Sequence, residues 1–165
     1  MLHLSGVNYE SINDAPGMNC VIFVSGCKHD CPGCHSPKTH DFTYGTKATK
    51  DVIGTINAEI SKRPFLSGLV LSGGDPMYSA KEVSNLLDEL VIPKERVWCF
   101  TGFRIEQLLG NEEQRELLQK IDVLVDGPFL SGERDVTLAY RGSRNQRLID
   151  VKATLQTNEV VLYQI

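Results

Sequence analysis

Four short apolar segments, each ended by a polar or glycine-containing turn, constrain the fold of this chain more than any other feature. They share β-branched and other apolar residues that predict buried strands, and they span residues 20–26, 68–72, 96–100 and 121–125. Segments with helical periodicity lie between them. Strands that alternate with helices predict βαβ units and a parallel sheet.

Three intervening segments have the pattern of amphipathic helices. Residues 48–61 offer Thr49 as an N-cap and place one apolar stripe on a helical face, formed by Val52, Ile53, Ile56 and Ile60. A second helix is predicted over 79–90, with a stripe formed by Val83, Leu86, Leu87 and Leu90. A third is predicted over 104–120, with a break at Gly110 and Asn111.

The length of the chain limits the architecture that these units can build. The 165 residues suggest one domain, 1–165. At roughly 30 residues per βα unit, the chain is too short for an eight-unit barrel. We therefore expect an α/β fold with mainly parallel strands, a partial (β/α) barrel or an open curved sheet. The tail, 148–165, contains β-like residues at 160–163 that favour a further strand.

Charge and hydropathy restrict the partners and the compartment. The net charge of −4, from 21 acidic and 17 basic residues, argues against a nucleic-acid binder. No apolar run approaches the roughly 20 residues of a membrane helix, and residues 1–9 lack the pattern of a signal peptide. We expect a cytoplasmic protein without a membrane partner. In that reducing compartment, the five cysteines indicate metal ligands, catalytic thiols or buried residues and not disulfides.

Three cysteines lie close together in the loop that follows the first predicted strand. Cys27, Cys31 and Cys34 form the pattern C-x3-C-x2-C, and their thiolates can converge on one metal centre. Iron–sulfur clusters take cysteine ligands, normally four for a [4Fe–4S] cluster, so three would leave one iron open to another molecule. The spacing alone also allows a structural zinc site, with His29 or His35 as the fourth ligand. Cys20 and Cys99 fall within predicted strands and are expected in the core.

Other candidate residues follow the remaining strands. Gly73 and Gly74 would let a ligand approach the backbone and leave N–H groups free to bind it, while Asp75 would complement a positive charge. The same segment also fits an ordinary turn. Thr101 and Asp126 would each bind a ribose or an amino group, or cap a loop. The carboxyl ends of parallel strands share one edge, so we expect these residues to gather there.

The segment 141–147, with the sequence Arg-Gly-Ser-Arg-Asn-Gln-Arg, is basic and polar. It fits a contact with a partner protein or an anionic ligand. It also fits a solvated loop, and the residue types favour the loop.

These motifs together resemble a known family. The C-x3-C-x2-C pattern after one strand and Gly-Gly-Asp-Pro after the next resemble the radical S-adenosylmethionine superfamily. Further segments are similar to the activating proteins of anaerobic (class III) ribonucleoside-triphosphate reductases: Asn19-Cys-Val-Ile-Phe-Val-Ser-Gly-Cys27, Trp98-Cys-Phe-Thr-Gly102, Asp122-Val-Leu-Val-Asp-Gly127 and Arg141-Gly-Ser-Arg-Asn-Gln146. The resemblance extends from about residue 8 to residue 150.

The resemblance implies a cofactor site at the strand edge. Cys27, Cys31 and Cys34 would hold a [4Fe–4S] cluster whose fourth iron binds S-adenosylmethionine. The remaining candidates would contact that cofactor: Gly73, Gly74 and Asp75 at its methionine end, Gly33, Cys34 and His35 along it, and Thr101 and Asp126 as further contacts. Many superfamily members have an aromatic or large apolar residue where this chain has Gly33, which would leave adenine stacking to His35. Other branches have Glu-Pro where this chain has Asp75-Pro76.

The resemblance also implies a reaction. The enzyme would be a radical S-adenosylmethionine oxidoreductase: an electron from the reduced cluster would split the sulfonium, and the 5′-deoxyadenosyl radical would take hydrogen from a glycine Cα of the reductase. The cofactor would supply this chemistry, so no protein side chain is expected to be catalytic. A flavodoxin-like protein would donate the electron.

Three alternatives stay open from the sequence. The first is an activase of another glycyl-radical enzyme, similar to formate lyase, against which the segment 141–146 argues. The second is a small-molecule radical enzyme, although so short a chain has few elements with which to enclose a small substrate. The third is a non-catalytic zinc-binding adaptor.

Overall fold

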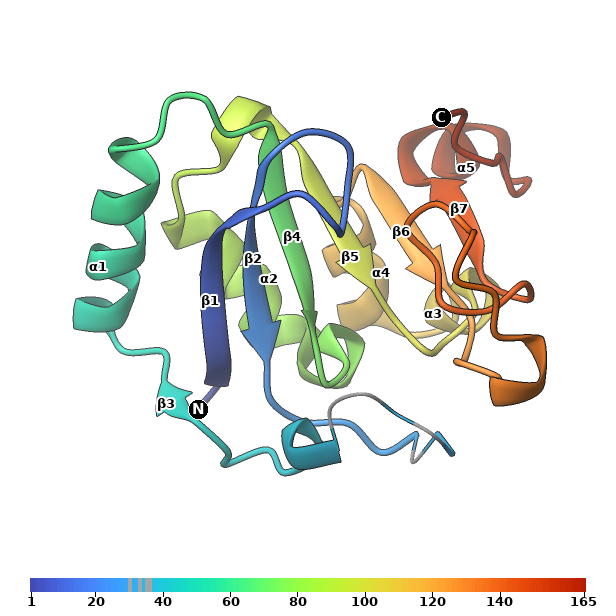
Figure 1. The fold of residues 1–165 in the computed structure, drawn as a ribbon, viewed down its shortest axis with the longest axis horizontal. Helices are drawn as coiled ribbons and strands as arrows, with labels where there is room; N and C mark the ends of the chain where they lie inside the picture. The colour runs from blue at the N-terminus through green and yellow to red at the C-terminus, as the bar shows by residue number, and fades with distance from the viewer. Residues whose placement is uncertain (30, 33, 35–36) are drawn as a thin grey trace.

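The strands of the chain form one mixed sheet. The computed structural model describes residues 1–29, 31, 32, 34 and 37–165. Within them the sheet has seven strands in the order β3-β1-β2-β4-β5-β6-β7 (Figure 1). The strands are β1 (His3–Ser11), β2 (Asn19–Val24), β3 (Thr46–Lys47), β4 (Gly68–Gly73), β5 (Val97–Phe100), β6 (Val123–Asp126) and β7 (Arg147–Asp150).

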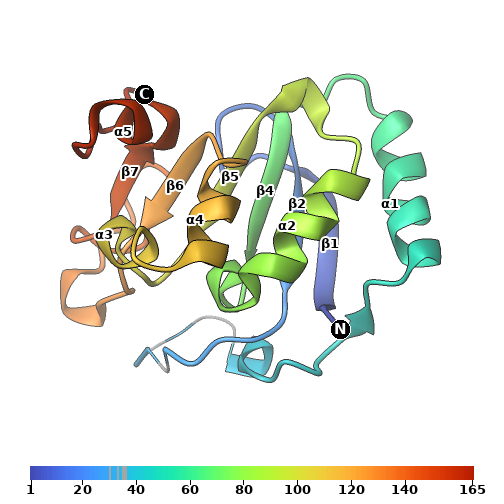
Figure 2. The same ribbon diagram turned by 180° about the vertical axis from the view of Figure 1, so that it is seen from behind.

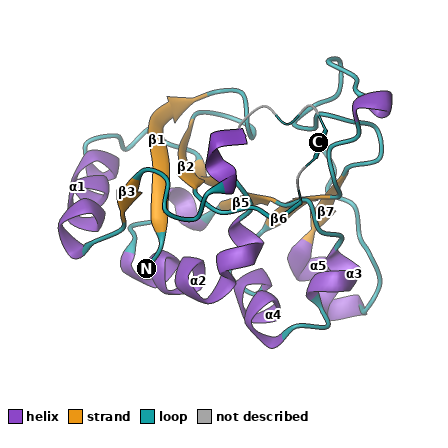
Figure 3. Ribbon diagram, turned by 90° about the horizontal axis from the view of Figure 1, so that it is seen from below, coloured by secondary structure: helices purple, strands orange, loops and turns teal. Residues whose placement is uncertain are grey.

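The centre of the sheet is the predicted parallel unit. Strands β2, β4, β5 and β6 pair in parallel, each beside the next. Helices α1 (Lys50–Ser61), α2 (Ala80–Glu89) and α4 (Glu112–Leu118) occur in the successive connections, and α2 and α4 lie against the same face of the sheet (Figures 2 and 3). The prediction of a partial α/β barrel with mainly parallel core strands is confirmed.

The helix boundaries follow from local capping. Thr49 precedes α1, and its hydroxyl accepts a hydrogen bond from the Val52 amide, as the sequence predicts. The predicted third helix is divided into α3 (Ile105–Leu108) and α4, with the break at Gly110. Asn111 begins α4, because its side-chain oxygen accepts from the Gln114 amide at 3.0 Å.

The two ends of the chain add antiparallel strands. At the N-terminus, β1 pairs with β2 and with β3, and none of the sequence patterns predicted it. At the C-terminus, β7 pairs with β6 and leads directly into α5 (Val151–Thr157). The strand predicted in the tail is thus found at Arg147–Asp150, earlier than expected. Residues 160–163, where it was expected, contribute one isolated bridge, between Leu162 and Ile149. Asp150 caps α5 by accepting from the Ala153 amide at 3.0 Å.

Side chains of the parallel strands are buried on both faces of the sheet. One face packs under the helices and includes Cys20 and Cys99, both fully buried, as predicted. Alternate residues point to the other face. There Trp98 contacts Tyr140 and Tyr163, which come from a loop and from the tail. Among the described residues, no helix has the length and apolar character needed to cross a bilayer.

Candidate functional site

A single cavity lies at the carboxyl edge of the parallel strands. It is lined by the three clustered cysteines and by residues that follow each strand: Cys27, Cys31 and Cys34 after β2, Gly73, Gly74 and Asp75 at the end of β4, Thr101 and Gly102 after β5, and Gly127 after β6. Phe100, Phe129 and Gln146 also line the cavity. Thus parallel topology brings together segments separated by up to a hundred residues.

The loop that bears the cysteines is closed at its base by backbone hydrogen bonds. The Gly26 amide donates to the Thr39 carbonyl at 2.6 Å, and the Cys27 amide donates to the His40 carbonyl at 3.3 Å. Gly26 has a φ of +111°, and a Cβ there would overlap the ring of Phe42. The 3-10 helix Pro37–His40 therefore stays beside the end of β2.

Cys27, Cys31 and Cys34 share this cavity. The Cys34 amide donates to the Cys31 carbonyl at 3.1 Å, which forms a turn between two of them. Burial raises the pKa of Cys27 to about 11, while a hydrogen bond from the His29 backbone N–H acts in the opposite direction. Gly33 and His35 lie outside the described residues, so their contacts with a cofactor stay predictions.

The glycine pair joins β4 to the cysteine loop. The Gly74 amide donates to the Val24 carbonyl at 2.7 Å, and the Asp75 amide donates to the Gly26 carbonyl at 2.8 Å. A Cβ on Gly74 would lie 2.7 Å from the carbonyl oxygens of both Gly26 and Thr39. The sequence predicted that the N–H groups of Gly73 and Gly74 are free for a ligand. That prediction was wrong for Gly74, because its amide already binds the Val24 carbonyl.

Asp75 is the centre of a buried hydrogen-bond network. Only 1% of the residue is exposed. Its Oδ1 accepts from the Met77 amide at 3.0 Å. Its Oδ2 lies 2.6 Å from His29 Nε2 and accepts from the Thr101 hydroxyl and the Gly102 amide, both at 2.9 Å. The carboxylate thus joins the cysteine loop to the ends of β4 and β5.

His29 is held by packing as well as by Asp75. Its ring centroid lies 4.9 Å from that of Tyr78 and 4.6 Å from that of Phe103. Gly102 leaves space for the imidazole, because a Cβ there would lie 2.7 Å from His29 Cδ2. The sequence identified His29 only as a possible zinc ligand, since nothing in it indicates a pairing across 46 positions.

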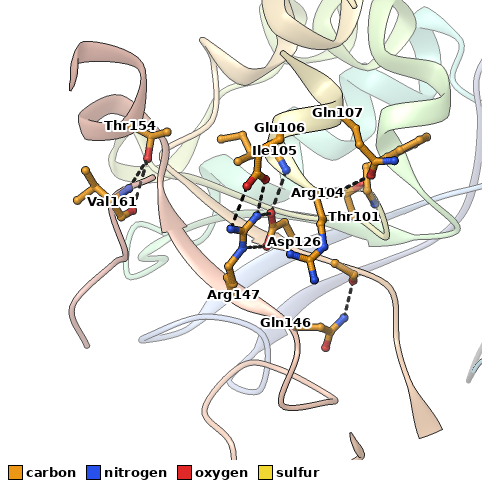
Figure 4. Close-up of polar contacts among 12 residues, drawn as sticks. Thr101, Arg104, Ile105, Glu106, Gln107, Asp126, Gln146, Arg147, Thr154 and Val161 are labelled. Atoms are coloured by element: carbon orange, nitrogen blue, oxygen red, sulfur yellow. Dashed lines mark hydrogen bonds and ion pairs between the residues drawn. The ribbon is translucent and has the colours of Figure 1, made fainter. Parts of the chain in front are cut away.

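Asp126 does not line the cavity. It is fully buried, and Arg147 binds it through two hydrogen bonds, Nε to Oδ1 at 3.0 Å and Nη2 to Oδ2 at 2.6 Å (Figure 4). The Ile105 amide also donates to Oδ2 at 2.9 Å. The hydrogen bonds that Arg147 donates to Asp126 and Glu106 raise the pKa of its guanidinium. These contacts hold α3 and β7 together, and they do not support the predicted cofactor contact of Asp126.

The segment 141–147 folds back onto the end of β6. Gln146 Oε1 accepts from the Gly142 and Ser143 amides at 2.8 and 3.1 Å, and its Nε2 donates to the Gly127 carbonyl at 3.0 Å. Asn145 Nδ2 donates to the Pro128 carbonyl at 2.7 Å. The segment is therefore an ordered wall of the cavity, and the favoured interpretation as a solvated loop was wrong for Gln146.

The donor set fits a [4Fe–4S] cluster. Among the described residues, no three His, Cys, Asp or Glu side chains are grouped closely enough to hold one metal ion. A [4Fe–4S] cluster binds each thiolate through a different iron, so three cysteines around one cavity suit it without converging on a single ion. Phe100 and Phe129 also line this cavity and add apolar residues to its wall.

Comparisons with known proteins agree with this arrangement. A family model described as a 4Fe-4S single cluster domain matches residues 13–149. Three similar proteins are each named anaerobic ribonucleoside-triphosphate reductase-activating protein. That of Escherichia coli (strain K12) is 37% identical over 82% of this chain and 90% of its own length. That of Vibrio cholerae is 38% identical over 81% and 88%, and that of Enterobacteria phage T4 is 34% identical over 86% and 93%.

Proposed function

Because the chain belongs to the family of anaerobic ribonucleoside-triphosphate reductase-activating proteins, we propose that it generates the glycyl radical of such a reductase. It is a radical S-adenosylmethionine enzyme with one [4Fe–4S] cluster. The observation that supports the proposal is the cavity at the carboxyl edge of the strands. Cys27, Cys31 and Cys34 line it together with the glycine loop, residues 73–75. The same edge is where parallel α/β folds place their active sites.

Each part of the chain has a distinct role in this proposal. The three cysteines hold the cluster and leave its fourth iron for S-adenosylmethionine. When bound, the cluster and S-adenosylmethionine would supply the radical chemistry: one electron would cleave the S–C5′ bond of the cofactor and release methionine, and a hydrogen atom of a reductase glycine Cα would pass to the 5′-deoxyadenosyl carbon. Gly73 and Gly74, with Gly33 and His35, border that cofactor. Phe100 and Phe129 limit the access of water to it.

The partners follow from the same reaction. The hydrogen donor is a glycine in a loop of the reductase, which enters the cavity from the edge of the sheet. The electron donor is a flavodoxin-like protein, since the reaction consumes one electron at a time. We place the reaction in the cytoplasm, where thiols are kept reduced before the cluster is assembled.

Anaerobic reconstitution tests the proposal. The protein is loaded with iron and sulfide, reduced, and mixed with S-adenosylmethionine and the reductase. We expect the cofactor to change the EPR signal of the cluster and a glycyl-radical signal to appear in the reductase. Cys31→Ser should lose both signals, whereas Cys99→Ala, a change at a core thiol, should retain them.

Three results would contradict the proposal. A protein that retains zinc and ignores S-adenosylmethionine would indicate a structural metal module. A radical that forms in a formate-lyase-like enzyme and not in the reductase would indicate a different partner. Hydrogen that is transferred to 5′-deoxyadenosine from a small molecule, and not from the reductase glycine, would indicate a small-molecule enzyme.

A further inference from the structure

A side-chain contact between His29 and Asp75 joins the cysteine loop to the glycine loop, residues 73–75. We infer that His29 is a positioning residue for the cluster and that Asp75 binds this histidine and not S-adenosylmethionine. Together they fix the backbone of the cysteine loop, so that the His29 amide faces the sulfur of Cys27. The inference rests on the proposed function, because it assigns these residues a role toward the cluster.

The position of the imidazole is fixed from several directions. Asp75 Oδ2 already accepts from the Thr101 hydroxyl and the Gly102 amide, so we assign His29 Nε2 as a third donor in the 2.6 Å contact with this oxygen. The rings of Tyr78 and Phe103 pack against the imidazole, and its side chain is only 16% exposed. Gly102 is the residue that leaves room for it. A side chain held in this way has little rotamer freedom left.

The backbone of the same residue reaches the cluster ligand. The backbone N–H of His29 is directed toward the thiol of Cys27, two positions earlier, and acts to lower the pKa of that thiol. Hydrogen bonds to cluster sulfurs are among the factors that set the reduction potential of an iron–sulfur centre. Such a bond stabilises the reduced cluster more than the oxidised one, because the reduced form has more negative charge. Fixing the His29 side chain therefore fixes a group that favours reduction.

Asp75 has little capacity left for a ligand. Three donors, from His29, Thr101 and Gly102, surround its Oδ2, and the Met77 amide binds its Oδ1. The residue is 1% exposed although it borders the cavity. To bind the amino group of the cofactor, it would have to release partners of which Thr101 and Met77 are buried and His29 and Gly102 half-buried, which costs free energy. The existing contacts thus favour a role in holding the loop.

Two variants of similar volume separate the side chain's hydrogen bond from its packing. His29→Leu cannot donate to Asp75, whereas His29→Gln places an amide N–H near the position of Nε2. We expect His29→Leu to shift the cluster's midpoint potential to more negative values, with roughly tenfold less reduced cluster at a fixed potential, or about 59 mV for one electron. His29→Gln should restore most of the shift. His3→Gln, on β1 and outside the cavity, should change nothing.

Asp75→Asn distinguishes the two roles of the carboxylate. If Asp75 positions His29, this variant shifts the midpoint potential in the same direction as His29→Leu, and the double variant shifts it no further. S-adenosylmethionine affinity, measured by titrating the EPR change of the cluster, then stays within about threefold of the wild type. If Asp75→Asn weakens that affinity tenfold or more while the potential is unchanged, the inference is wrong.

The outcomes also separate this inference from the proposed function. A wild-type protein that assembles no S-adenosylmethionine-responsive cluster contradicts both. If the wild type activates the reductase but the cluster of His29→Leu has the same midpoint potential as that of the wild type, only the inference is contradicted. If His29→Leu binds less iron, circular dichroism of the metal-free protein decides the cause. The inference is supported if the His29→Leu chain is folded and binds little iron while His29→Gln binds as much as the wild type. It is contradicted if both variants bind little iron.

Discussion

Replacing Arg147 by methionine tests the interpretation of Asp126 as a structural carboxylate. Asp126 is fully buried, and Arg147 supplies two of the three hydrogen bonds that the structure gives its side chain. Methionine retains much of the apolar stem of arginine, so the main loss is the charge that compensates the carboxylate. Breaking a buried pair from one side costs about 3–5 kcal/mol, because the remaining charge is unpaired.

The lower end of that range applies to this pair. The Arg147 side chain is 23% exposed, and the Ile105 amide still binds Asp126 after the change. We therefore expect a loss of about 3 kcal/mol in the free energy of unfolding, or roughly 6–12 °C in melting temperature for a chain of this size. Anaerobic urea unfolding of the metal-free protein, followed by circular dichroism, measures the loss as a lower midpoint at an unchanged m-value.

Glu106 provides the matched control. It also binds Arg147, at 2.6 Å, but its side chain is 56% exposed. Glu106→Gln should therefore cost no more than about 1 kcal/mol. The double variant Asp126→Asn with Arg147→Met should recover part of the loss, since no unpaired charge is then buried. If Arg147→Met costs no more than Glu106→Gln, the pair is not the structural element inferred here.

Three further predictions concern the glycine loop, a surface ion pair and the wall of the cavity. Gly74→Ala should destabilise the chain by about 1–3 kcal/mol and lower its iron content after reconstitution, because the new Cβ meets backbone oxygens; equal iron in variant and wild type would contradict this. Hydrogen bonding to Arg147 lowers the pKa of Glu106 below its ordinary value of 4.5. Its stabilising effect is therefore complete above that value and lost as the pH falls through the lowered pKa, so urea midpoints of wild type and Glu106→Gln should converge in acid. Gln146→Leu should make residues 128–146 more sensitive to limited proteolysis while cluster loading persists, since two backbone amides lose their acceptor; unchanged cleavage would show that Gln146 does not order this wall.

The parallel core was predictable because its strands are continuous apolar runs. Strand β1 was not, for a physical reason. Its apolar residues Leu4 and Val7 pack on the same core cluster, although strict alternation would place them on opposite faces. A register shift between Leu4 and Gly6 accounts for this. Such a bulge changes the period of the pattern, so alternation cannot reveal the strand.

The site was predictable in its residue types and its place, but not in its hydrogen bonds. Topology alone brings strand ends to one edge, so the sequence predicted which segments meet there. Which donor binds which acceptor depends on the tertiary structure. Asp75 pairs with His29 from a loop, and Asp126 pairs with Arg147 on β7, a strand that was predicted later in the chain. Both carboxylates were predicted to face a ligand because their partners could not be identified from the sequence.

The closed base of the cysteine loop has a consequence for survival after damage by air. Many small metal sites form only as the chain folds around the ion, so losing the metal unfolds them. Here the backbone bonds from Gly26 to Thr39 and from Cys27 to His40 involve no thiolate, and the sheet behind them is held by its own strand pairing and by a buried apolar core. Destruction of the cluster should therefore leave a folded scaffold. Repair would then require iron and sulfide but no chaperone. The same molecule would regain its cluster and its activity whenever anaerobic conditions return.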